Sequence, residues 1–171
     1  KIIITGGLGY IGTELCKLYS GISWNNTIIV IDNRFISERV NQIRNWNMEF
    51  VQGDILDKKL ILKYCKDADV VHHLAGVTDV PRTKSESNKT QDDKIKIVAE
   101  EGTQNILDAI SDNCKIIFPS THVVYEGVEK IQNDILETEE VKPNLAYSSS
   151  KAINEKQLKN SGKNYIILRL G

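Results

Sequence analysis

The chain has 171 residues, and its 22 basic and 23 acidic side chains leave a formal net charge of −1 at pH 7. This balance gives no electrostatic reason to bind nucleic acid or an anionic membrane surface, and no apolar run approaches the length that crosses a bilayer. The length predicts a single domain with a substantial hydrophobic core.

The chain opens with a strand, a glycine-rich turn and a helix. Residues 1–4 are an apolar, β-branched run, and residues 10–20 carry apolar side chains at helical spacing. The turn between them is spaced both as G-x-x-G-x-x-G and as G-x-G-x-x-G, through Gly6, Gly7, Gly9 and Gly12. Such glycines let a pyrophosphate approach the backbone at a helix N-terminus, where unpaired N–H groups favour negative charge.

A second buried strand, residues 27–31, ends in Asp32, which lies 20 residues beyond Gly12. A carboxylate at this place can accept hydrogen bonds from both ribose hydroxyls of an adenosine. Glycine turns also occur for purely structural reasons, but this spacing favours a dinucleotide site.

The rest of the chain continues the alternation of strands and helices. We predict strands at 48–51, 70–75, 115–118 (closed by Pro119) and 165–170, and helices at about 38–44, 58–65, 91–111, and from Asn144 or Ser148 to 161. Residues 76–90 read as a loop and 120–143 as a long connection. This order predicts an α/β fold, a Rossmann-type doubly wound parallel sheet that occupies residues 1–171 as one dinucleotide-binding domain.

The cysteines and histidines predict neither disulfides nor a metal centre. Cys16, Cys65 and Cys114 are odd in number and far apart, so we expect buried, reduced thiols and a cytoplasmic location. The three histidines have no metal-like partners at useful spacing, and we expect no metal site.

A second motif is Y-x-x-x-K, formed by Tyr147 and Lys151. Four-residue spacing places both side chains on one face of a helix. A free tyrosine titrates near pH ~10, so a tyrosine base at neutral pH needs its pKa lowered by roughly 3 units. A neighbouring ammonium and the positive ring of an oxidised nicotinamide both act in that direction. Alone, the motif is common enough that an accidental pair on an exposed helix is the more frequent explanation.

Taken together, these motifs resemble the extended short-chain dehydrogenase/reductase family, in its NAD-dependent nucleotide-sugar epimerase and dehydratase branch. The resemblance runs through nearly the whole chain. Its elements are T-G-G-x-G-Y-I-G at 5–12, Asp32, Gly53-Asp54-Ile55, His73-Leu74-Ala75-Gly76, Ser120-Thr121, Val124-Tyr125, Pro143, Tyr147-x-x-x-Lys151, Glu155 and Leu168-Arg169.

The resemblance implies NAD as cofactor, a nucleotide sugar as substrate, and a homodimer. The implied catalytic residues are Tyr147 as base and acid, Thr121 as the hydroxyl that orients the substrate oxygen, and Lys151. The implied cofactor-binding residues are Gly6, Gly9, Tyr10, Ile11, Gly12, Asp32, Asn33, Asp54, Ile55, Leu74, Ala75, Gly76, Tyr147 and Lys151. Asp32 would repel the 2′-phosphate of NADP, which favours NAD, although Arg34 stands two residues away.

Departures from the family pattern bear on the reaction. His122 and Val123 follow Thr121 where sugar dehydratases carry an acid, which argues against elimination of water. One residue, Glu126, is inserted before Gly127. We therefore expect an epimerase; the alternatives are a dehydratase, reductase or decarboxylating synthase of the same family, or a non-catalytic NAD(P)-sensing domain. A smaller C-terminal substrate domain is expected beyond Gly171.

Overall fold

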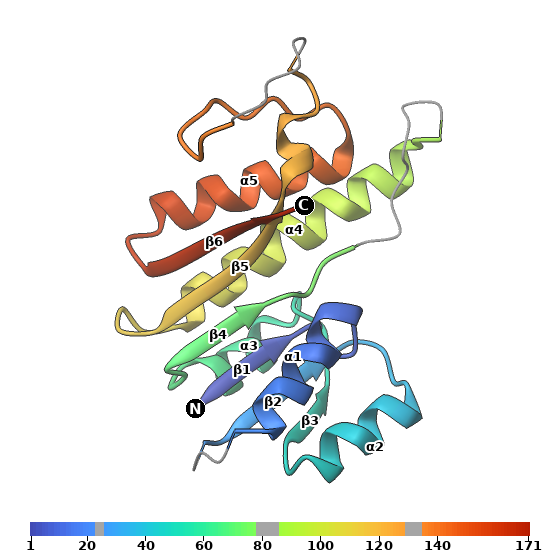
Figure 1. Ribbon diagram of the computed structural model, residues 1–171, viewed down its shortest axis with the longest axis vertical. Coiled ribbons are helices and arrows are strands. Elements are labelled where there is room, and N and C mark those ends of the chain that lie inside the picture. The colour runs from blue at the N-terminus through green and yellow to red at the C-terminus, as the bar shows by residue number, and fades with distance from the viewer. Residues whose placement is uncertain (23–25, 78–85, 129–134) are drawn as a thin grey trace.

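The computed structural model describes residues 1–22, 26–77, 86–128 and 135–171. Its six strands form one sheet in the order β3-β2-β1-β4-β5-β6, and all neighbouring strands are parallel (Figure 1). The strands are β1 (Ile2–Thr5), β2 (Ile28–Asp32), β3 (Glu49–Gln52), β4 (Val70–His73), β5 (Lys115–Thr121) and β6 (Asn164–Leu170). The helices are α1 (Tyr10–Ser20), α2 (Ser37–Asn45), α3 (Lys58–Cys65), α4 (Lys89–Ala109) and α5 (Ala146–Asn160), with a 3₁₀ turn η1 (His122–Tyr125).

Helices cover both faces of the sheet, which explains why β1 and β2 are buried apolar runs up to their last residues. Ile2 and Ile4 pack in a cluster with residues of α1 and α2, whereas Ile3 packs in a second cluster with residues of α3, α4 and α5. Figure 1 shows the same arrangement, with α1 and α2 in front of the sheet and α4 and α5 behind it. The predicted doubly wound parallel sheet is confirmed.

The order of strands reverses between β1 and β4, and this creates the place where a ligand can bind. The chain runs from β1 outward to β3, then returns to β4 on the other side of β1 and continues to β6. The loops that follow β1 and β4 therefore diverge at the carboxyl edge of the sheet, and a crevice opens between them.

Several element boundaries differ from the prediction by one to three residues; β4, for example, ends at His73 and not at residue 75. Two of the differences have a visible cause. β5 does not close at Pro119 but continues to Thr121, because the pairing of β4 with β5 ends at Ile117 and only β6 pairs beyond it. α4 begins at Lys89 rather than at residue 91, because the side-chain oxygen of Asn88 accepts the N–H of Gln91 at 2.9 Å and caps the helix. Of the predicted loop 76–90, residues 78–85 lie outside the described residues.

The thiols of Cys16, Cys65 and Cys114 are free and buried, as predicted. Burial raises the pKa of the Cys65 thiol to about 12. In the described part of the chain, no helix combines the length and the apolarity needed to cross a membrane. The same residues contain no group of three or more His, Cys, Asp or Glu side chains placed to hold a metal ion.

Candidate dinucleotide and catalytic site

A cavity of about 1170 Å³ lies at the carboxyl edge of the sheet. Its walls come from the glycine turn, the ends of β2, β4 and β5, and parts of α4 and α5. The structure brings every residue nominated from the sequence to this cavity: Gly6, Gly9, Tyr10, Ile11, Gly12, Asp32, Asn33, Asp54, Ile55, Leu74, Ala75, Gly76, Thr121, Tyr147 and Lys151. Their individual binding and catalytic roles stay predictions.

The glycine turn leaves no room for side chains. Gly6 has a φ of 69°, and a Cβ there would lie 2.6 Å from the backbone nitrogen of Ala75. A Cβ on Gly12 would lie 2.6 Å from the carbonyl oxygen of Gly6. Gly9, which precedes α1, has no side chain that could cap the helix. The first turn of α1 therefore presents backbone N–H groups to the cavity, as a pyrophosphate requires.

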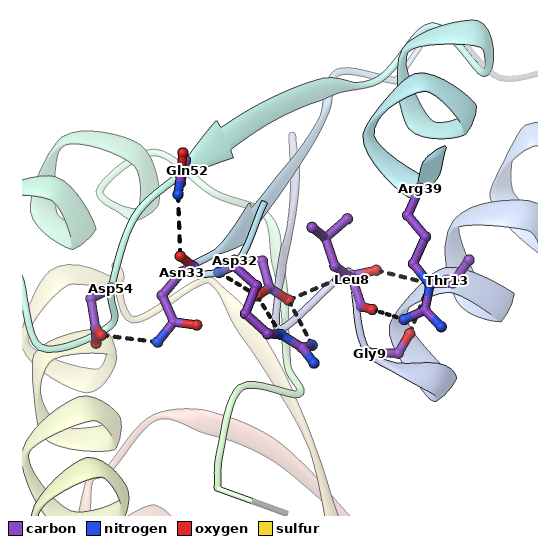
Figure 2. Close-up of polar contacts among 10 residues, drawn as sticks. Leu8, Gly9, Thr13, Asp32, Asn33, Arg39, Gln52 and Asp54 are labelled. Carbon is purple, nitrogen blue, oxygen red and sulfur yellow. Dashed lines mark hydrogen bonds and ion pairs between the residues drawn. The ribbon is translucent and has the colours of Figure 1, made fainter. Parts of the chain in front are cut away.

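Asp32 is a hydrogen-bonding centre at the end of β2 (Figure 2). Its Oδ2 accepts the N–H of Leu8 at 2.9 Å, and its Oδ1 accepts the backbone N–H of Arg34 at 3.0 Å and that residue's Nε at 3.2 Å. The carboxylate is buried, while the Arg34 side chain is 55% exposed. Because the guanidinium is exposed, it can move aside and free carboxylate lone pairs for ribose hydroxyls.

The ends of β2 and β3 are joined by a second set of polar contacts. Asn33 donates its Nδ2 to Oδ2 of Asp54 at 3.1 Å (Figure 2). Oδ1 of Asp54 accepts the N–H of Leu56 at 2.9 Å. Arg39 reaches from α2 to the carbonyl of Leu8. These contacts fix the wall where the resemblance places adenosine.

Tyr147 and Lys151 lie one turn apart on α5, and both face the end of β5. The ammonium of Lys151 donates to the carbonyl of Pro119 at 2.9 Å and lies 5.8 Å from the centroid of the Tyr147 ring. Burial lowers the pKa of Lys151 to about 8. Burial also raises the pKa of Tyr147, so the lowering expected from the sequence is not supplied by the chain's own residues.

A buried carboxylate, that of Glu155, is hydrogen-bonded to the end of β5. Ser120 donates its hydroxyl to Oε1 of Glu155 at 2.7 Å, and Arg169 donates to both oxygens of Glu155, at 2.9 and 2.6 Å. Burial is the largest single influence and raises the pKa of Glu155, but the hydrogen bonds from Arg169 and Ser120, together with the charges of Arg169 and Lys159, outweigh it and lower that pKa. Thr121, the next residue, is buried, and its Oγ1 accepts the N–H of Val123 at 3.3 Å.

His122 also lines the cavity, with Nδ1 3.1 Å from the carbonyl oxygen of Leu170. A carbonyl only accepts hydrogen bonds, so Nδ1 carries the proton in this contact, and Nε2 of a neutral ring is left with its lone pair.

The sequence analysis missed one wall of the cavity, the first half of α4. Its residues follow helical spacing: Thr90, Asp93, Lys94, Ile97 and Val98. The spacing is visible in the sequence, but Thr90 falls in the predicted loop and no motif in the predicted helix at 91–111 marks a binding residue. Arg39 was also missed, since a lone arginine on a short helix has no signal of its own.

The fold and the cavity together define a dinucleotide-binding domain of the Rossmann type. The residues present fit an NAD-like group, because the turn admits backbone approach only and a buried carboxylate stands at the end of β2.

Comparisons with known proteins show to which family of Rossmann-type domains this chain belongs. The family model described as NAD dependent epimerase/dehydratase family matches residues 2–171. CDP-paratose 2-epimerase of Salmonella typhi is 35% identical over 150 residues, which are 81% of this chain and 41% of that protein. The dTDP-D-glucose 4,6-dehydratase of Dictyostelium discoideum is 31% identical over 169 residues, which are 89% of this chain and 38% of that protein.

A solved structure extends the likeness to the fold. UDP-glucose 4-epimerase from Brucella ovis, in complex with NAD, matches with a TM-score of 0.78 and 28% identity over 98% of this chain and 50% of that chain. The chain belongs to the NAD-dependent epimerase/dehydratase family, which confirms the resemblance. It spans half or less of the length of these relatives.

Proposed function

We propose that the whole protein is an NAD-dependent nucleotide-sugar epimerase. The observation that carries the proposal is that Thr121, Tyr147 and Lys151 line one cavity with the glycine turn and Asp32. A site for binding NAD alone has no use for a hydroxyl, a phenol and a buried ammonium at the nicotinamide end. The CDP-paratose 2-epimerase relative supports the same reaction type.

In this proposal Thr121, Tyr147 and Lys151 hold one hydroxyl oxygen of the sugar and transfer the proton of that hydroxyl. Oxidised NAD, when bound, accepts hydride and brings a positively charged ring. Thr121 donates a hydrogen bond to the sugar oxygen, and Tyr147 takes the proton from that hydroxyl as its carbon gives up hydride. The resulting keto sugar turns and takes hydride back on its other face, while Tyr147 returns the proton. No net oxidant is consumed.

Dehydration is the second candidate, and the Dictyostelium relative favours it. Elimination of water needs a general acid beside the leaving hydroxyl. The residues after Thr121 are His122 and Val123, so the carboxylic acid typical of that branch is missing at this place. This difference favours epimerisation.

The reaction is tested by incubating the full-length protein and NAD with UDP-, CDP- and dTDP-sugars. An epimerase yields a product of unchanged mass with inverted stereochemistry in NMR spectra, and the NADH absorbance band shows no lasting change. Loss of water identifies a dehydratase, and stoichiometric consumption of NADH or NADPH identifies a reductase. Saturable NAD binding without turnover of any sugar would contradict the proposal and favour a sensing domain.

Tyr147→Phe tests the proposed base. The substitution removes one oxygen and keeps the ring, so we expect turnover to fall on the order of 10²–10⁴-fold while NAD affinity stays close to that of the wild type. Tyr165→Phe is the matched control, since Tyr165 lies on β6 and does not line the cavity. Near-native turnover by Tyr147→Phe would contradict the assignment.

A further inference from the structure

Thr121 and Tyr147 belong to different elements. The distance between their side chains therefore depends on the contacts that hold those elements together. Thr121 ends β5 and is followed directly by η1. Tyr147 is the second residue of α5, so it lies in the first helical turn, where helices fray most readily. Its phenol can hold one position only if the start of α5 is anchored.

The segment that enters α5 is hydrogen-bonded to the segment that leaves η1. Lys142 donates its N–H to the carbonyl of Val124 at 2.8 Å, and Gly127 donates its N–H to the carbonyl of Lys142 at 2.7 Å. The two segments approach closely: a Cβ on Gly127 would lie 2.5 Å from that carbonyl oxygen. The two segments are thus held in one register.

Glu126 completes this contact with its side chain. Its Oε1 accepts the N–H of Asn144 at 2.8 Å, the N–H of Leu145 at 2.7 Å, and the hydroxyl of Ser148. Leu145 is the residue before α5, and its own side chain has no oxygen with which to cap the helix. A carboxylate that follows η1 therefore holds the two residues before α5 and a hydroxyl of its first turn, with a charge that suits a helix N-terminus.

We propose that Glu126 is a positioning residue that fixes Tyr147 relative to Thr121. The inference rests on the proposed function for its catalytic consequence. Glu126 follows η1, in which the N–H of Val123 is capped by the hydroxyl oxygen of Thr121 itself, so one short path connects the two reacting side chains. A displacement of about 1 Å at a reacting group lowers rates by as much as ~10²-fold. Anchoring the first turn of α5 is therefore a requirement for turnover and not for nucleotide binding.

The test compares Glu126→Ala, Glu126→Gln and the control Glu140→Ala in the full-length protein. Glu126 and Glu140 are both exposed, so the substitutions leave the core intact. We expect kcat of Glu126→Ala to fall by about 10–100-fold, with KM and the NAD dissociation constant within about 3-fold of the wild type. Glu126→Gln keeps an acceptor oxygen, so its kcat should fall by less than about 5-fold. Glu140→Ala should behave as the wild type.

Amide hydrogen exchange gives a readout that does not depend on turnover. Exchange at Asn144 should accelerate in Glu126→Ala and change little in Glu126→Gln, because the first variant removes its acceptor. Exchange at Leu145 should accelerate less, because its N–H also donates to Oγ of Ser148 at 3.1 Å. Unchanged exchange in Glu126→Ala overturns the inference even if no nucleotide sugar is turned over, so this failure is separate from failure of the proposed function. A wild-type kcat for Glu126→Ala, or NAD affinity that falls in step with kcat, overturns it as well.

Discussion

The ammonium of Lys151 is buried in the wall of the cavity, where its charge costs stability. Its ammonium is surrounded by the Pro119 carbonyl at 2.9 Å and by the Phe118 ring, whose centroid is 4.5 Å away. These contacts stabilise the charge incompletely, since burial still lowers the pKa of Lys151 to about 8. Charged groups with such shifts concentrate at functional sites, where they are retained at the expense of folding free energy.

Lys151→Met should therefore stabilise the protein against unfolding while abolishing turnover. The folded state releases the Lys151 proton near pH 8 and the unfolded state near 10.5. Between these values the unfolded state binds more protons, so the wild type gains stability as pH rises. We expect the variant to be more stable by about 1–3 kcal/mol at pH 7, and this advantage to shrink toward pH 10.

Urea unfolding of both proteins at pH 7, 8.5 and 10 measures the effect, with the exposed Lys156→Met as control. A constant difference across this range would contradict the buried-charge explanation. Weaker NAD binding by Lys151→Met is expected in addition, because the resemblance assigns the ammonium a ribose contact.

At the scale of elements, a buried polar chain joins four of them beneath the cavity. His73 on β4 contacts the hydroxyl of Thr5 on β1 through Nδ1 at 3.0 Å, and the hydroxyl of Thr103 on α4 through Nε2 at 2.9 Å. Asn154 on α5 donates to the same Thr103 oxygen at 2.9 Å. The hydroxyl of Thr5 in turn accepts the N–H of Ala75 at 3.3 Å. This series of hydrogen bonds thus links α5, which carries Tyr147, to the loop after β4.

Thr103→Val tests this chain, because it keeps the shape of the side chain and removes the central hydroxyl. His73 then loses its Nε2 partner in a buried place, which should lower the free energy of unfolding by about 1–3 kcal/mol. The exposed Thr138→Val should change it by less than about 0.5 kcal/mol. Chemical denaturation measures both; equal effects of the two substitutions would refute the network's contribution.

Features that depend on one element could be predicted from the sequence, and features that depend on how two elements pack could not. A strand that is buried on both faces can be predicted from its continuous apolar run, as for the residues before Asp32. The glycine turn can also be predicted, because its geometry follows from its own residues. The extension of β5 past Pro119 depends on where β4 stops pairing, and the sequence near Pro119 does not encode that. Likewise, Thr103 meets His73 and Asn154 only after α4 has packed against β4 and α5, so no spacing along the chain predicted these contacts.

At the scale of the whole molecule, the sheet separates two apolar clusters, and His73 is buried at the end of the central strand β4. Its ring packs against Phe118, with centroids 5.7 Å apart, and the charge of Lys151 acts on it from α5. Burial, with a smaller contribution from Lys151, lowers the pKa of His73 to about 3. Folding therefore holds this imidazole neutral under conditions that protonate it in the unfolded chain.

This difference predicts acid sensitivity of the entire domain. The unfolded chain takes up a proton at His73 near pH 6.5, whereas the folded state does so only near pH 3. Between these values the unfolded state binds more protons, so the free energy of unfolding falls as pH falls, by up to about 1.4 kcal/mol per pH unit. Above pH 6.5 both states are neutral at His73, and this contribution to the pH dependence vanishes.

His73→Gln separates this contribution from that of the carboxylates, because glutamine keeps a polar group but does not titrate. The variant should be less stable than the wild type at pH 7, since its amide cannot reproduce both hydroxyl contacts. Between pH 7 and pH 5, however, the wild type should lose about 2 kcal/mol more than the variant in urea unfolding. An NMR titration of the folded wild type supplies a direct check, because the His73 imidazole should keep its neutral chemical shifts down to pH 5. Protonation of that ring near pH 6.5 in the folded protein would refute the prediction.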